Sequence, residues 1–183
     1  MPETRREFLK HGGYAVAASV LLGCDRAPAA RTEIIEMRSE PLGTNVWFDP
    51  IGLCVTPGTI VRWVVRENVH TTTAYHPRND KHSLRIPARA TPWDSGFLVQ
   101  PGDHFEIVLS EPGVYDYFCA PHEIAGMVGR IVVGKPLGPG ALAFDYWNGK
   151  TGTSDWRRVP DAARNALPSV SRILAERRIR RAG

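Results

Sequence analysis

The most informative part of this chain reads Tyr115-Asp-Tyr-Phe-Cys-Ala-Pro-His-Glu-Ile-Ala-Gly-Met127. It holds a cysteine, then a histidine three residues later and a methionine five residues beyond that. Thiolate, imidazole and thioether are soft or borderline ligands, which suit copper better than calcium, magnesium or an all-thiolate zinc site. The trigonal copper arrangement needs one thiolate, two imidazoles and a weak axial thioether, so a second histidine must come from elsewhere in the fold. His70 is the best candidate.

The residues that lead to the cysteine alternate as a β-strand does. Tyr115, Tyr117 and Cys119 fall on one face of an extended segment, so we expect them to point into a core. Pro121 cannot donate a ladder hydrogen bond, and the strand is therefore expected to end before it. Residues 120–126 would then form a tight loop at one end of a sheet, which brings the cysteine, histidine and methionine around one point.

The motif continues beyond this loop and has a counterpart upstream. It reads Cys-x2-His-x4-Met followed by Val-Gly-x-Ile-x-Val, with Asn68-Val-His70 earlier in the chain. In these features the chain resembles the type 1 (blue) copper cupredoxins of the plastocyanin, pseudoazurin and halocyanin-like family. The resemblance covers about residues 34–135 and includes further motifs in the same order: Phe48-Asp-Pro50, Val55-Thr-Pro-Gly58, Val61-Arg-Trp63, Ile86-Pro87 and Gly113-Val-Tyr-Asp-Tyr117.

The resemblance implies one type 1 copper ion and a full set of ligands for it. His70, Cys119 and His122 match the equatorial ligands of the family, and Met127 matches the axial one. The chain departs from many relatives at Thr71, where they place an asparagine that pins the ligand loop by hydrogen bonding. A threonine hydroxyl can make such a bond.

Two alternatives for the metal site are weaker. A four-ligand zinc site would need Met127 as a ligand or a recruited carboxylate such as Glu123. His76 is the reserve candidate if His70 is not a ligand. However, His76 and His82 lie in a polar, punctuated segment, and we expect both to be solvated loop residues.

The rest of the chain predicts an all-β fold. Turn signals separate short runs of β-branched and aromatic residues, and the chain has 17 glycines and 15 prolines, which favours a Greek-key β-sandwich or barrel. Trp63 is expected in its core, and Tyr115 resembles the tyrosine corner of such sandwiches. The predicted extended segments are 46–48, 53–55, 59–65, 104–109, 113–119 and 129–134.

The N-terminus reads as an address. Residues 4–10, Thr-Arg-Arg-Glu-Phe-Leu-Lys, resemble a twin-arginine export signal, and Leu21-Leu-Gly-Cys24 resembles a bacterial lipobox. We therefore expect residues 1–23 to be a signal peptide and Cys24 to carry lipid. Residues 24–33 would tether the cupredoxin domain, 34–135, to the outer face of the cytoplasmic membrane, in the periplasm.

The assignments of Cys24 and Cys119 leave one further cysteine, Cys54. With Cys24 given to lipid and Cys119 to copper, Cys54 has no partner and is expected to be a small apolar strand residue. A bridge between Cys24 and Cys54 would be possible only if Cys24 were not lipidated.

The C-terminal extension, residues 136–183, is expected to be partly helical. Prolines suited to a first turn predict two short helices, over 160–166 and 168–181. From residue 155 onward there are 8 basic and 3 acidic residues, against 12 basic and 14 acidic over 24–154. The basic excess is more typical of a solvated helix face than of a site for anionic lipid or an acidic partner.

These features predict an electron carrier rather than an enzyme. Catalytic copper sites need further histidines, and the chain has no His-x-His pair. We expect single electrons to pass between transient redox partners, such as a cytochrome or a membrane oxidoreductase, which would dock on a small apolar patch around His122. No small-molecule substrate is expected, and the export signal excludes nucleic acid. The alternative is a periplasmic copper-binding protein that buffers or delivers the metal.

Overall fold

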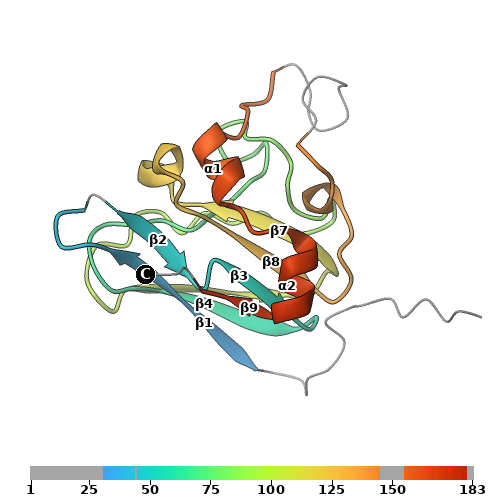
Figure 1. Ribbon diagram of the computed structural model, residues 1–183, viewed down its shortest axis with the longest axis horizontal. Helices are drawn as coiled ribbons and strands as arrows, with labels where there is room; N and C mark the ends of the chain where they lie inside the picture. The colour runs from blue at the N-terminus through green and yellow to red at the C-terminus, as the bar shows by residue number, and fades with distance from the viewer. Residues whose placement is uncertain (1–30, 44, 145–154, 181–183) are drawn as a thin grey trace, which may run out of the picture.

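A computed structural model describes residues 31–43, 45–144 and 155–180. Two β-sheets pack face to face, and two short helices lie beside the second sheet (Figure 1). The predicted β-sandwich with a helical extension is therefore confirmed. The expected signal peptide, the lipid site at Cys24 and most of the tether lie outside the described residues. The first strand begins at Thr32, two residues inside the expected tether.

The first sheet has one face in the core and one face in solvent. Its strand order is β2-β1-β4-β6, in which β1 and β4 are parallel and the other pairs antiparallel. Buried and half-buried residues alternate along β4, so Val61, Trp63 and Val65 point inward, as the period of two in a strand requires. The four strands are β1 (Thr32–Ser39), β2 (Val46–Asp49), β4 (Thr59–Val65) and β6 (His104–Leu109).

The second sheet is covered on both faces. Its order is β5-β7-β8-β3-β9, and every residue of β3, β7 and β8 is buried. The inner face lies against the sandwich core, while the C-terminal extension covers much of the outer face. The strands are β3 (Gly52–Val55), β5 (Thr73–Ala74), β7 (Gly113–Phe118), β8 (Val128–Val133) and β9 (Arg178–Ile179).

Aromatic side chains fill the space between the sheets. Trp63 is fully buried, as predicted, and its ring lies 5.3 Å from that of Tyr117, which in turn lies 4.8 Å from Phe48. The hydroxyl of Tyr115 donates a 2.7 Å hydrogen bond to the carbonyl of Glu111, four residues upstream. This is the bond of a tyrosine corner, which the sequence had indicated.

The C-terminal extension has the two expected helices, but it ends in a short strand instead of a longer second helix. The helices are α1 (Asp161–Ala166) and α2 (Val170–Glu176). The second helix stops earlier than the expected range of 168–181, because Arg177 takes a positive φ of 65°. The chain then joins the second sheet as β9, antiparallel to β3. Ile173 of α2 packs on Val114 and Val132, on the outer face of that sheet.

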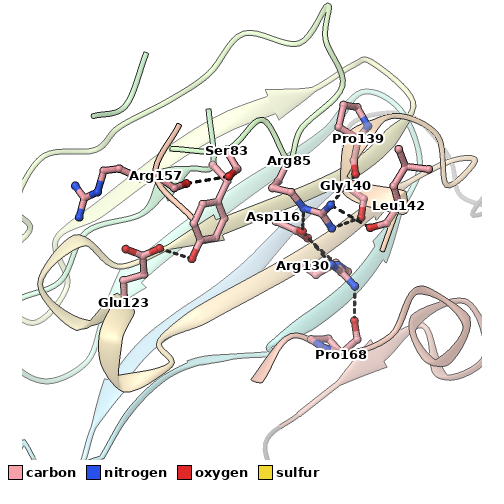
Figure 2. A network of polar contacts seen from close by, with 11 residues as sticks. Ser83, Arg85, Asp116, Glu123, Arg130, Pro139, Gly140, Leu142, Arg157 and Pro168 are labelled. Atoms are coloured by element: carbon pink, nitrogen blue, oxygen red, sulfur yellow. Dashed lines mark hydrogen bonds and ion pairs between the residues drawn. The ribbon is translucent and has the colours of Figure 1, made fainter. Parts of the chain in front are cut away.

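A buried ionic network ties this extension to the second sheet (Figure 2). Asp116 is fully buried and accepts hydrogen bonds from the guanidinium groups of Arg85, at 3.1 Å, and Arg130, at 2.7 and 2.9 Å. The two arginines also donate to backbone carbonyls of the extension: Arg85 to Pro139, Gly140 and Leu142, and Arg130 to Pro168. Both cations are thereby paired and hydrogen-bonded, as burial requires.

The cysteines differ in part from expectation. Cys54 is a buried strand residue, as predicted, but it is disulfide-bonded, so the prediction that it has no partner is wrong. Its bonding partner is not among the described residues, and Cys24 lies outside them too. Cys119 is a free, buried thiol. No helix in the described part of the chain has the length and apolar character of a membrane span.

Candidate metal centre

The structure brings three of the predicted ligands together. The ligand atoms of His70, Cys119 and His122 all lie within 4.8 Å of one another. The sulfur of Cys119 is 3.7 Å from Nδ1 of His70 and 3.3 Å from Nδ1 of His122. His70 lies in the chain between β4 and β5, where it pairs with Leu98, whereas the other two lie in the turn from β7 to β8. Distant segments thus present a thiol and two imidazoles to one point.

Local hydrogen bonds shape the turn that carries Cys119 and His122. Residues Ala120–Ala125 form a short 3-10 helix, here called the ligand loop, with Pro121 in its first turn. The amide of His122 donates to the carbonyl of Cys119 at 3.0 Å, and the amide of Cys119 donates to the carbonyl of Met127 at 3.0 Å. Gly126 ends the loop with a φ of 81°, a conformation that glycine adopts without strain.

Met127 closes the loop at the start of β8. Its amide donates to the carbonyl of His122 at 3.1 Å, so its backbone is fixed to that of the histidine. The side chain is fully buried and belongs to the same core cluster as Cys119. With the thiol and the two imidazoles, a buried thioether from this residue would complete a donor set that fits copper.

Thr71 takes the pinning role for which relatives of the resembled family use asparagine. Its hydroxyl accepts a 2.7 Å hydrogen bond from the amide of Ala120, which joins the His70 segment to the ligand loop. Its own amide donates to the sulfur of Cys119 at 3.3 Å. This second bond favours negative charge on the sulfur. The departure from asparagine therefore keeps the same connection.

Burial controls the protonation of the three groups in the metal-free protein. It lowers the pKa of His70 from 6.5 to about 4, with a further lowering by His122, against the raising effect of the Glu67 carbonyl. It also lowers the pKa of His122. Burial raises the pKa of the Cys119 thiol to about 11, opposed by the hydrogen bonds from Thr71. At neutral pH both imidazoles are therefore free to bind a cation, and the thiol must release a proton to do so.

Of the three clustered ligands, only His122 reaches the surface. His70 and Cys119 have no exposed area, whereas His122 is half-buried. Its loop neighbours Pro121, Ile124 and Ala125 are exposed, and Ile124 is 79% exposed. An apolar surface therefore surrounds the one ligand that a partner protein can touch.

The other candidate ligands are elsewhere. Among the described residues, the cluster includes neither the reserve candidate His76 nor Glu123, the possible zinc ligand. His82 is only 4% exposed, so the prediction that it is a solvated loop residue is wrong. Its segment pairs with Arg157 of the C-terminal extension, and its ring packs on Phe118 at 4.3 Å. The polar residues around His82 in the sequence do not indicate that Arg157 and Phe118, which are distant in the chain, cover it.

Comparisons with known proteins agree with this site. The family model of the copper binding proteins of the plastocyanin/azurin family matches residues 36–134. A plastocyanin from Prochlorothrix hollandica is 30% identical over 124 residues, which are 64% of this chain and 84% of that protein. A plastocyanin from a Synechococcus strain is also 30% identical over 124 residues, with 67% and 84% covered.

A solved pseudoazurin from Sinorhizobium matches a larger share of the chain. Its TM-score is 0.54 at 25% identity, and the match covers 80% of this chain and 95% of that one. This share is larger than the region that the family model covers. Members of the family hold one type 1 copper ion and carry electrons rather than catalyse a reaction. The chain belongs to the plastocyanin/azurin family of copper-binding proteins.

Proposed function

We propose that this protein is an extracytoplasmic blue-copper electron carrier, tethered to the membrane, that passes single electrons between redox proteins. Its copper ligands are His70, Cys119, His122 and Met127. One observation carries the proposal, namely the convergence of the Cys119 sulfur with two imidazole Nδ1 atoms inside a 4.8 Å cluster. Copper bound there would supply a one-electron couple.

The protein's own groups suit fast electron transfer. The amide of Thr71 stabilises charge on the Cys119 sulfur, and the buried ring of His70 keeps water away from it. The sulfur and Met127 belong to the packed core, and backbone hydrogen bonds fix the ligand loop. Such a close-packed frame allows little rearrangement, so the site changes little when one electron enters or leaves.

Electrons would enter or leave at the exposed edge of His122. The apolar surface around it, formed by Pro121, Ile124 and Ala125, fits brief contact with another redox protein. Small apolar contacts of this kind are typical of transient electron-transfer complexes. The partner is inferred by its chemistry alone, as a cytochrome or a membrane oxidoreductase.

The test of the copper site is a substitution of the sulfur ligand. The soluble fragment loaded with Cu(II) should show an intense visible band and a narrow hyperfine splitting in its electron paramagnetic resonance (EPR) spectrum. Cys119→Ser should abolish both, whereas Cys54→Ser, which opens a disulfide outside the cluster, should leave them unchanged. A blue colour that survives Cys119→Ser would refute the site. A colourless, easily stripped metal in the wild-type protein would favour copper buffering or delivery instead.

The membrane tether is a separate part of the proposal. Its support is the sequence of residues 4–10 and of Leu21-Leu-Gly-Cys24. The sulfur of Cys24 can carry lipid or form a disulfide with Cys54, but not both, so the bonded state of Cys54 in a chain of three cysteines counts against the tether. Intact mass and membrane fractionation of the exported protein distinguish the two. Acylated protein in the membrane fraction, lost in Cys24→Ala, is expected, and a soluble, unacylated wild-type protein would overturn the tether.

A further inference from the structure

The ligand loop is oriented in an unusual way, because its charged side chain is inside and its apolar ones are outside. Glu123 is the one buried residue of Ala120–Ala125, and only 5% of it is exposed. Its neighbour Ile124 is 79% exposed. Hydrophobic burial alone would favour the reverse. Something beneath the loop must therefore hold the carboxylate.

Two buried side chains hold it. The hydroxyl of Tyr75 donates a 2.7 Å hydrogen bond to one carboxylate oxygen of Glu123, and Nε2 of His82 lies 3.2 Å from the other. Tyr75 is fully buried and His82 is 4% exposed. Figure 2 shows Glu123 on the loop with its carboxylate turned toward the sheet. Both carboxylate oxygens thus have a partner, as burial of this group requires.

The other ring nitrogen of His82 also has a partner. Nδ1 lies 2.6 Å from the carbonyl of Asn79, which can only accept, so Nδ1 is the donor in this contact. The imidazole is therefore fixed from two sides, by the Asn79 carbonyl and by the Glu123 carboxylate.

Tyr75 and His82 also contact strand β7, which leads to Cys119. The ring of Phe118, the residue before Cys119, lies 4.6 Å from the ring of Tyr75 and 4.3 Å from that of His82. The amide of Tyr75 donates to the carbonyl of Asp116 on β7 at 3.1 Å. One cluster thus contacts the chain on both sides of Cys119, through Phe118 and through Glu123.

We propose that Glu123 is a positioning residue for the copper site. Its carboxylate, held by Tyr75 and His82, anchors the ligand loop from below. This keeps the ring of the adjacent His122 in place and leaves Ile124 facing outward for a partner. The inference depends on the proposed function, in which His122 is a copper ligand.

Three variants test the anchor through spectra rather than stability. Glu123→Ala removes both bonds, and Tyr75→Phe removes only one. Glu123→Gln keeps an oxygen for Tyr75 and an amide that can donate to His82. We expect Glu123→Ala and Tyr75→Phe to shift the EPR hyperfine splitting and the midpoint potential of the copper. We also expect Glu123→Ala to slow electron self-exchange about tenfold, because small misplacements at a reacting centre have large effects on rate. Glu123→Gln should restore values near those of the wild type.

Tyr115→Phe is the matched control. It also removes a buried tyrosine hydroxyl that makes one 2.7 Å hydrogen bond, but to the carbonyl of Glu111 and away from the ligand loop. It should lower stability and leave the spectrum and the potential unchanged.

The outcomes separate this inference from the proposed function. Spectra and potential unchanged in Glu123→Ala and Tyr75→Phe would overturn the anchor, while a blue wild-type protein keeps the copper site. A Glu123→Gln protein as altered as Glu123→Ala would also overturn it, because the hydrogen bonds would then not be the cause. If Glu123→Ala does not fold, Tyr75→Phe against Tyr115→Phe decides. A wild-type protein without a blue site would instead remove the proposed function.

Discussion

The two sheets of the sandwich bury their residues differently. Strand β4 of the first sheet alternates between buried and half-buried positions, whereas β7 and β8 of the second sheet are buried throughout. The proposed metal ligands Cys119 and Met127 lie next to the ends of these two covered strands. The ligands thus attach to the sheet with packing on both faces. Because close-packed interiors deform little, this sheet gives the site its firmest support, and the C-terminal extension contributes to it.

The largest effect should come from breaking the ionic network on the covered sheet. Asp116→Ala would leave Arg85 and Arg130 buried without their counter-ion, which should lower the free energy of unfolding by about 4 kcal/mol. The matched change on the first sheet is Glu106→Ala, which removes an exposed ion pair with Arg62 and should cost no more than about 0.5 kcal/mol. Urea unfolding of the metal-free proteins measures both. Equal losses would mean that the sheets do not differ.

Apolar cover on the second sheet should count nearly as much. Ile173 of α2 is fully buried, and Ile173→Ala should cost about 3 kcal/mol through the cavity it leaves. Val108 of β6 is 58% exposed, so Val108→Ala should change stability by less than about 0.5 kcal/mol. Thermal unfolding distinguishes them. A small loss for Ile173→Ala would show that the extension merely touches the sheet.

The metal-free protein should lose stability in mild acid. Burial lowers the pKa of His70 from 6.5 to about 4, so the unfolded chain takes up a proton at a higher pH than the folded one. The contribution of His70 to the free energy of unfolding is therefore complete above pH 6.5. It falls by about 3 kcal/mol as the pH drops to 4. Unfolding across this range should show it, and His70→Gln should flatten the profile. His104→Gln, at an exposed histidine of the first sheet, should not.

The smallest predicted effect concerns two buried threonines. Thr71→Val removes the 2.7 Å bond from the Ala120 amide, and Thr59→Val removes a 2.8 Å bond to the Thr56 carbonyl on the first sheet. Each should cost about 1 kcal/mol. Only Thr71→Val should also change the EPR spectrum, because only that hydroxyl holds the ligand loop. A spectral change in both would place the effect in general loosening of the sandwich.

Much of the fold and site could be predicted from the sequence because the signals are local. The expected ranges of β4 and β6 match the structure, since turn residues bound each alternating run. Cys119 and His122 share a short motif, and His70 was the best remaining imidazole. Three of the four expected ligands, His70, Cys119 and His122, meet in one cluster.

The missed features depend on contacts between distant parts of the chain. His82 looked solvated, because nothing near it shows that Arg157 and Phe118 cover it. The helical spacing after Val170 gave no sign that Arg177 turns the chain into β9. Such contacts leave no periodic trace in the segments that make them.

Strand β9 has a consequence for biosynthesis. It follows every other described strand in the chain, yet it pairs with β3, whose outer edge would otherwise be open. An open edge can pair with a second polypeptide. During synthesis, the edge of β3 therefore stays unpaired, and able to pair with another chain, until Arg178 and Ile179 have been made. The pairing that covers this edge forms only after all the other described strands have been synthesised.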